Sequence, residues 1–262
     1  MTKAKVNAKE MLKKKGTLGI WATLGASCIA EIISSVGFDW ILFDCEHGAN
    51  RSNNLADQLN AVRSFDQNIA CIVRAGSNDI VEIKRILDVG VDGIMIPMIC
   101  SRAEAELVIK YCNYPKVGMR GVSGICRASG YGLRKDYLER ASNELCILIQ
   151  VENTEGINNL DDILSVDGID GVFIGPSDLA ASMGKLGKPS DEKVEKEILR
   201  ALNRILKKGI PAGTIALSTD GIINRFRQRF TFVATVHDAH FFTQQLNAFK
   251  NSLSIELKKS IK

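Results

Sequence analysis

Eight short apolar runs, separated by amphipathic segments, constrain the fold of this chain more than any other feature. In the segments between them, apolar residues recur every three or four positions, which is the spacing of helices with one buried face. The runs lie at Thr17–Trp21, Asp39–Asp44, Ile69–Arg74, Gly93–Pro97, Leu145–Val151, Asp170–Ile174, Ile210–Ala216 and Thr231–Val236. Eight strand-then-helix units in 262 residues predict an α/β fold, a (β/α)₈ TIM barrel that takes residues 1–262 as one domain.

The segments that flank the runs have signatures of their own. An amphipathic start, with Val6, Met11 and Leu12 among lysines, predicts a lead-in helix. A last helix is predicted over Phe241–Ser254. The region 114–143 is rich in Gly and Arg, which is typical of a functional loop over a site rather than of regular structure.

A doubly wound open sheet is the alternative fold. It would need a Gly-rich motif that binds a dinucleotide or a phosphate after its first strand. Residues 21–25 (WATLG) do not form such a motif, so the barrel is favoured.

The charge of the chain argues against a nucleic-acid partner. The net charge is +4, but ten of the 34 basic and two of the 30 acidic residues lie in 1–15 and 250–262. The rest of the chain therefore carries 24 basic against 28 acidic residues and is slightly acidic. Such a surface, without aromatic residues interleaved among basic ones, does not favour nucleic acid.

Two further sequence patterns indicate the cellular compartment of the protein. No apolar run is long enough to span a bilayer, and Met1–Gly16 is lysine-rich and polar, unlike a secretory signal. The seven cysteines include no C-x-x-C pair. We therefore expect reduced thiols, no membrane partner and a cytoplasmic location.

Polar side chains gather where the predicted strands end. The carboxyl ends of parallel strands meet at one rim of a barrel, so these side chains should lie close together. Buried strands that end this way at several places are hard to explain by core packing alone, and they predict a functional site. The residues are Asp44, His47, Arg74, Gln150, Glu152, Asp178, His237 and Asp238.

Glu152 and Asp178 follow neighbouring strands and form the centre of this prediction. Two hard oxygen ligands, with room left for water and substrate, describe an open divalent-metal site better than a structural cage. The turn that carries Asp178 opens a helix, where the N–H groups of Ser177 and Asp178 favour a carboxylate. Such a site could chelate a 2-oxo acid through its carbonyl and one carboxylate oxygen.

Other candidates have two interpretations each. His47 is either a general base or a structural histidine in a Gly-flanked turn. Arg74 either holds an anionic substrate, which we favour, or forms an ion pair with a nearby carboxylate. Asp88 either has a specific partner or is a solvated acid at a helix end. His237 and His240 either line the rim or cap the last helix.

In their order along the chain, these motifs closely resemble those of the metal-dependent (class II) pyruvate aldolases of the HpcH/HpaI family. The resemblance runs from about Gly19 to Gly187. Its most specific parts are Glu46-His47-Gly48 and Gly175-Pro-Ser-Asp178-Leu. Phe38-Asp-Trp, Val73-Arg, Leu87-Asp, Gly118-x-Arg-Gly, Gln150-Val-Glu and Asp170-Gly-Val-Phe-Ile also match.

The resemblance implies a role for each matching residue. Glu152 and Asp178 would hold a divalent metal ion, Mg²⁺ or Mn²⁺ first, with Co²⁺ and Zn²⁺ as alternatives. His47 would be the acid/base, oriented by Asp88, and Arg74 would bind the carbonyl or enolate oxygen. The residues implied in substrate binding are Trp21, Gln150, Gly175, Pro176 and Ser177.

The implied reaction forms or cleaves a 4-hydroxy-2-oxo acid, with pyruvate and an aldehyde as the small-molecule partners. The alternative is a citrate-lyase-like or citrate-synthase-like enzyme that uses an acyl-CoA. For that chemistry, the sequence offers only the arginines 120, 127 and 134 as a phosphate cluster. The family also implies a homo-oligomer, a hexamer built from dimers that exchange their last helix. The chain departs from the family pattern at Cys45 and at Thr235–His240, where the family has a small, Gly-containing turn before the acid.

Overall fold

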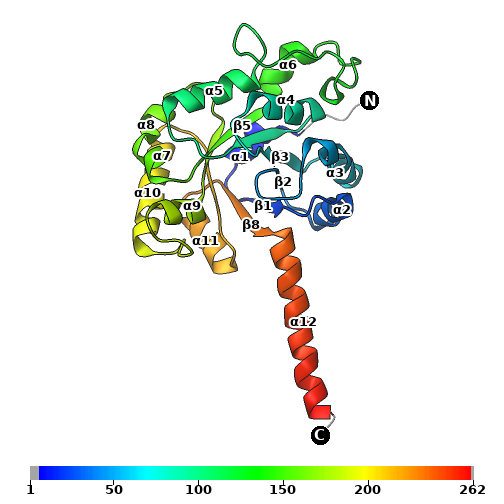
Figure 1. Cartoon of the computed structure of the whole chain (residues 1–262), viewed down its shortest axis with the longest axis vertical. Coiled ribbons are helices and arrows are strands. Elements are labelled where there is room, and N and C mark those ends of the chain that lie inside the picture. Colours follow the sequence, from blue (N-terminus) through cyan, green and yellow to red (C-terminus); the bar gives the residue numbers. More distant parts are fainter. Residues whose placement is uncertain (1–5, 261–262) are drawn as a thin grey trace.

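The computed structural model describes residues 6–260, apart from the side chain of Lys259, and shows a closed barrel of eight parallel strands (Figure 1). Each strand pairs with the next along the chain, and β8 closes the circle by pairing with β1. The strands are β1 (Thr17–Ala22), β2 (Trp40–Asp44), β3 (Ala70–Arg74), β4 (Gly93–Ile96), β5 (Cys146–Val151), β6 (Gly171–Ile174), β7 (Ala212–Ile215) and β8 (Phe232–His237). The predicted barrel is confirmed, and the doubly wound sheet is excluded.

Helices surround the barrel and bury one face each. In α10, for example, Val194, Ile198, Leu202 and Ile205 recur at helical spacing and are buried. The helices are α1 (Ala8–Lys13), α2 (Ser27–Val36), α3 (Ser52–Phe65), α4 (Ile80–Val89), α5 (Arg102–Cys112), η1 (Arg127–Ser129), α6 (Tyr137–Glu144), α7 (Thr154–Asn158), α8 (Leu160–Ile163), α9 (Pro176–Ser182), α10 (Glu192–Lys207), α11 (Thr219–Arg227) and α12 (Asp238–Ser260).

The core has two parts. The larger cluster fills the space between the strands and the helices, and the smaller one fills the barrel interior with side chains such as Trp40, Phe173 and Phe232. Met11 and Leu12 of the lead-in helix α1 belong to the interior cluster. The helix therefore closes the end of the barrel at which the strands begin.

The expectation for the region 114–143 is wrong in two respects. It contains η1 and α6, and α6 is braced by an ion pair between Arg134 and Glu144 (2.8 Å). The region also packs on the last residues of α4, where Arg127 donates to the carbonyl of Val89. Because α4 runs opposite to the strands, its last residues lie where the strands begin. The region therefore does not lie over the carboxyl ends of the strands.

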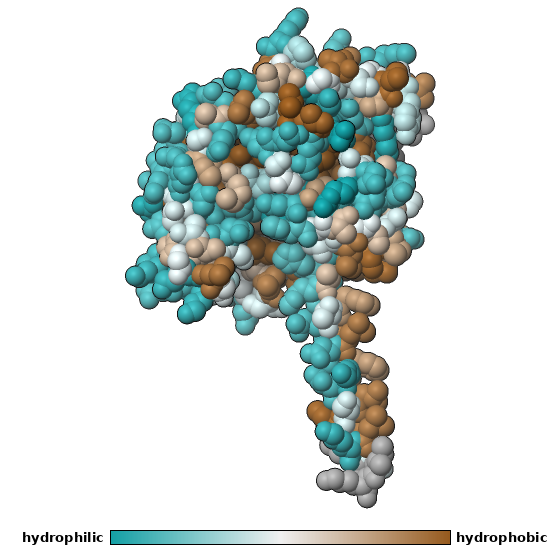
Figure 2. Space-filling model, in the orientation of Figure 1, coloured by the Kyte–Doolittle hydropathy of each residue, from teal (hydrophilic) through white to brown (hydrophobic). Residues whose placement is uncertain are grey.

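The last helix, α12, is longer than predicted and projects away from the barrel (Figure 1). Its 23 residues give a rod of about 34 Å. Apolar side chains form a stripe along it, which Figure 2 shows in brown, and we call these residues the α12 stripe: Phe242, Leu246, Phe249, Leu253 and Leu257. All five are exposed. Within residues 6–260, no helix is both long and apolar enough to cross a membrane.

Candidate active site

The carboxyl ends of β2 and β3 carry a buried ion-pair network. Asp44 and Arg74 are register partners, and both side chains are buried. Arg74 donates from Nε to Asp44 Oδ1 (2.8 Å) and from Nη2 to Oδ2 (2.7 Å), a bidentate pair. Its Nη1 lies 2.9 Å from Glu46 Oε2. Arg74 thus pairs with nearby carboxylates, which was the less favoured of its two interpretations in the sequence analysis.

This network also fixes the charge states of its members. Burial pushes the pKa of Asp44 up, but the hydrogen bonds and charge of Arg74, with the N–H groups of Glu46 and His47, outweigh burial and leave the pKa below 3.8. The guanidinium carbon of Arg74 lies 4.9 Å from the ring centroid of Trp21. Arg74 is therefore a fixed cation beside an aromatic wall.

Glu152 follows the last residue of β5 and is only 2% exposed. It accepts a hydrogen bond from the backbone N–H of Met98 (2.9 Å) on one oxygen and one from Gln150 Nε2 on the other. Burial raises its pKa to about 7, the Met98 hydrogen bond opposes this, and the charges of Asp178 and Glu46 raise it further. A buried carboxylate with two acidic neighbours is costly unless a cation joins it.

The backbone around Glu152 is shaped to hold it. Met98 adopts a left-handed conformation (φ 57°), which is uncommon for a residue other than Gly and aims its N–H at Glu152. On the other side, a Cβ atom at Gly175 would lie 2.5 Å from Glu152 Oε2 and 3.0 Å from Gln150 Nε2. Only Gly fits this approach.

We expect Gly175→Ala to displace the Glu152 carboxylate. The added methyl group should cost about 1–3 kcal/mol of unfolding free energy, as overpacking does. Binding of Mn²⁺ should weaken at least about tenfold, since one ligand moves. Urea unfolding and calorimetric titration measure the two effects. Gly124→Ala is the control, because nothing lies within 4 Å of a Cβ there; equal Mn²⁺ binding by the Gly175 variant and the control would contradict this steric account.

Asp178 lies near Glu152 at the start of the next helix. Gly175 precedes α9, Pro176 is its first residue, and Ser177 and Asp178 are exposed in its first turn. Pro is favoured at this position because its missing N–H would have no helical partner. Gly175, three residues before Asp178, lies against the Glu152 carboxylate, and the charge of Asp178 raises the pKa of both Glu152 and Glu46.

The donor set fits a hard divalent cation in an open site. Within residues 6–260, no group of three or more His, Cys, Asp or Glu side chains is arranged to hold a metal ion. A cation here would take the carboxylates of Glu152 and Asp178 and keep positions for water and substrate. Gln150 Oε1 and Trp21 Nε1 are buried and have no hydrogen-bond partner among the described residues. Buried polar atoms are normally paired, so these two mark where a ligand or water completes the site.

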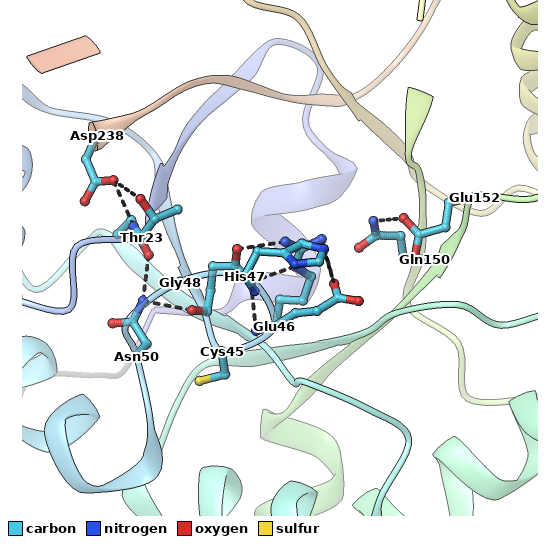
Figure 3. Close-up of polar contacts among 12 residues, drawn as sticks. Thr23, Cys45, Glu46, His47, Gly48, Asn50, Gln150, Glu152 and Asp238 are labelled. Carbon is cyan, nitrogen blue, oxygen red and sulfur yellow. Dashed lines mark hydrogen bonds and ion pairs between the residues drawn. The ribbon is translucent and has the colours of Figure 1, made fainter. Parts of the chain in front are cut away.

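His47 lies at the rim, in the loop between β2 and α3. Its side chain is exposed, and its Nε2 lies 3.9 Å from Glu46 Oε2. Figure 3 shows Glu46 and His47 on one side and Gln150 and Glu152 on the other. An exposed imidazole across from the buried Glu152 carboxylate can exchange protons with a molecule held between them.

The structure does not bring Asp88 to His47. Asp88 lies in the last turn of α4, at the strand-start end of the barrel, about 15 Å of helix away from the rim. Its carboxylate pairs with the buried Arg120 (2.7 Å). Within one chain, Asp88 therefore does not reach His47, and its role in orienting His47 stays a prediction; of the two interpretations of Asp88, the pair with Arg120 supports the specific partner.

Two residues of the site, Glu46 and Met98, were given no role in the sequence analysis, and Asp44 was placed at the rim without a partner. Asp44 and Glu46 pair with Arg74, and the N–H of Met98 donates to Glu152. The pairing of Asp44 with Arg74 could have been predicted, because their strands both end in a charged residue and the two charges are of opposite sign. The role of Met98 could not be predicted from its side chain, since its contribution is a backbone N–H.

Several known proteins are similar to this chain in sequence or in fold. The family model described as HpcH/HpaI aldolase/citrate lyase matches residues 17–244. The chain belongs to this family. The match covers every strand, so the resemblance seen in the motifs, and the aldolase-type carbon–carbon lyase that it implies, are confirmed.

Individual members of the family are similar to this chain over most of its length. A hydroxypyruvate/pyruvate aldolase of Sagittula stellata is 41% identical over 76% of this chain and 78% of its own length. A 4-hydroxy-2-oxo-heptane-1,7-dioate aldolase of Shigella flexneri is 37% identical over 92% of each chain. The crystal structure of a family protein from Burkholderia cenocepacia superimposes with a TM-score of 0.91, at 28% identity, over 95% of this chain and all of the other.

Proposed function

We propose that this protein is a metal-dependent aldolase that forms or cleaves a 4-hydroxy-2-oxo acid, with pyruvate and an aldehyde as the other partners. The observation that carries the proposal is the buried carboxylate of Glu152, which lies beside Asp178 and across the rim from His47. The names of the relatives from Sagittula stellata and Shigella flexneri support the same reaction class.

The mechanism assigns Glu152 and Asp178 to a divalent ion, Mg²⁺ or Mn²⁺ first and Co²⁺ or Zn²⁺ as alternatives. When bound, such an ion supplies positive charge that stabilises a developing enolate oxygen. Two of the five N–H groups of Arg74, on Nε and Nη2, donate to Asp44, and Nη1 lies 2.9 Å from Glu46 Oε2 as an ion pair, so N–H groups on Nη1 and Nη2 are left for that oxygen.

The other residues bind and position the substrate. Gln150 would lie next to pyruvate, the turn Gly175–Ser177 beside the pyruvate carboxylate, and the ring of Trp21 would form a wall of the substrate site. His47 takes a methyl proton from pyruvate and returns a proton to the aldehyde oxygen when the new bond forms. Cleavage uses the same groups in reverse.

Proton exchange tests the proposal. Purified protein is incubated with pyruvate in deuterated water, with EDTA or with Mg²⁺, Mn²⁺, Co²⁺ or Zn²⁺, and the methyl signal is followed by NMR. We expect the signal to disappear only when a divalent ion is present. No exchange with any of the four ions would refute the aldolase proposal.

The acyl-CoA alternative has less support. Its phosphate cluster would need free arginines, but Arg120 pairs with Asp88, Arg134 pairs with Glu144, and Arg127 donates to Asn60 and to the Val89 carbonyl. Release of CoA from acetyl-CoA and oxaloacetate, in place of pyruvate exchange, would favour this alternative.

We further propose a cytoplasmic homo-oligomer in which α12 is exchanged between two copies, with three such dimers in a hexamer. Residues 240–258 of α12 are exposed on all sides, and within residues 6–260 no helix after β8 packs back on the barrel (Figure 1). Leu18 of β1 and Ile32 and Val36 of α2 are correspondingly exposed there. The α12 stripe of a second copy would cover them. Seven cysteines without a C-x-x-C pair support a reducing compartment.

Charges placed on the α12 stripe test this assembly. We expect Phe242→Glu combined with Phe249→Glu to convert the oligomer to monomers, because two charges would be buried without partners. Light scattering after size-exclusion chromatography measures the mass. Gln244→Glu combined with Asn251→Glu adds the same charge on the opposite face of the helix and should leave the mass unchanged. A monomeric unmodified protein would contradict the exchange.

A further inference from the structure

An irregularity in β8 determines where His237 points. Gly19 pairs with Ala234, but the next pair is Trp21 with His237, so β8 has one more residue than β1 over this stretch. Side chains alternate along a regular strand, and His237, three residues after the inward-facing Ala234, would then face outward. The β-bulge turns it inward instead, beside Trp21.

His237 is therefore part of the aromatic layer at the rim. Its ring centroid lies 5.7 Å from that of Trp21, and Trp21 lies 5.4 Å from Phe173 and under the guanidinium of Arg74. Within residues 6–260, the imidazole makes no hydrogen bond, and its nitrogens are not sealed from solvent. The neighbouring indole N–H of Trp21, which is 3% exposed, also has no partner.

The charges around His237 determine what it can bind. Arg74, the cation that faces it from β3, is already shared by Asp44 and Glu46. Asp238 accepts from the backbone and hydroxyl of Thr23, and His240 is exposed on α12. Burial lowers the pKa of His237, against the charge of Asp44, and so favours the neutral imidazole. A neutral imidazole offers one donor and one acceptor, which suits a hydroxyl group better than a carboxylate.

We propose that His237 and the indole N–H of Trp21 bind the hydroxyl group next to the carbonyl of the aldehyde, so that the enzyme selects 2-hydroxyaldehydes. The inference rests on the proposed aldolase function and specifies its second substrate. An alkyl aldehyde would leave the imidazole and the indole N–H unpaired at the rim, which is the situation in which hydrogen-bonding sites discriminate most strongly.

Paired aldehydes test the inference. The rate of aldol formation from pyruvate is measured with glycolaldehyde, acetaldehyde and succinate semialdehyde, and the ratio of kcat/KM for glycolaldehyde to that for acetaldehyde is compared between variants. The different intrinsic reactivities of the aldehydes cancel in this comparison. We expect His237→Val to lower the ratio about 10²-fold, and His237→Gln, whose amide also donates and accepts, to restore most of it. His240→Val, at the exposed histidine three residues later, should keep the original ratio.

Exchange of the pyruvate methyl protons in deuterated water, followed in the same samples, distinguishes a failure of the aldolase proposal from a failure of the proposed role of His237. Exchange that persists while His237→Val leaves the aldehyde ratio unchanged would overturn the role of His237 alone. A preference of the unmodified protein for succinate semialdehyde over glycolaldehyde would also overturn it. Absence of methyl-proton exchange in the unmodified protein would overturn both proposals.

Discussion

Glu152→Gln is expected to reduce metal-dependent proton exchange of pyruvate at least about 10³-fold, which corresponds to about 4 kcal/mol in the barrier. The substitution keeps the size of the side chain and removes the negative charge that would hold the cation. NMR of pyruvate in deuterated water, at saturating Mn²⁺, measures the rate. Added Mn²⁺ should raise the melting temperature of the unmodified protein but not that of the variant, because only the former binds the ion.

The same substitution should not harm the metal-free fold. Burial already raises the pKa of Glu152 to about 7, so a neutral amide relieves a cost when no cation is present. The melting temperature of Glu152→Gln in EDTA should equal or exceed that of the unmodified protein. Glu155→Gln removes an exposed acid three residues later and should leave exchange intact. Full exchange in Glu152→Gln would remove the central assignment of the site.

Arg74→Ala has the largest expected effect on stability. Without the guanidinium, Asp44 would remain 1% exposed with no cation beside it. Breaking a buried ion pair from one side costs about 3–5 kcal/mol of unfolding free energy. Urea denaturation measures the loss. Arg102→Ala removes one member of an exposed ion pair and should change stability little.

Acid should reduce the difference between Arg74→Ala and the unmodified protein. The pKa of folded Asp44 lies below 3.8, so its stabilising contribution is fully present above pH 3.8 and is lost as the pH falls through the folded-state pKa. The double variant Asp44→Leu, Arg74→Met leaves no buried charge and should recover most of the stability. A double variant that is less stable than Arg74→Ala alone would contradict this electrostatic account.

The sequence predicted those parts of the molecule that depend on local pattern. All eight strands lie within about two residues of the predicted runs, because a buried strand needs an uninterrupted apolar run. Glu152 and Arg74 could be placed at the rim for the same reason, since each stands where its run ends. Gln150 and the turn that begins at Gly175 were placed at the rim by the same pattern, and the family resemblance added their roles in binding substrate.

The errors arose where packing between distant segments decides the outcome. The motif around Asp88 could not show that, within one chain, the direction of α4 places this residue at the opposite end of the barrel from His47, where it pairs with Arg120. The Gly- and Arg-rich composition of 114–143 could not show which end of the barrel the region covers. The inward turn of His237 depends on a bulge in β8 that only the pairing with β1 reveals.

The turn from β8 into α12 has a consequence for engineering. Asp238, the first residue of α12, accepts hydrogen bonds from the N–H groups of Thr23 (Figure 3) and Leu24. His237, immediately before it, packs on Trp21. The proposed subunit contacts of α12 and the proposed aldehyde contact of His237 are therefore joined by one peptide bond. On these two proposals, libraries that diversify this turn to widen the range of aldehydes will also contain variants with weakened subunit contacts. A search for new specificity should therefore screen for particle mass alongside turnover.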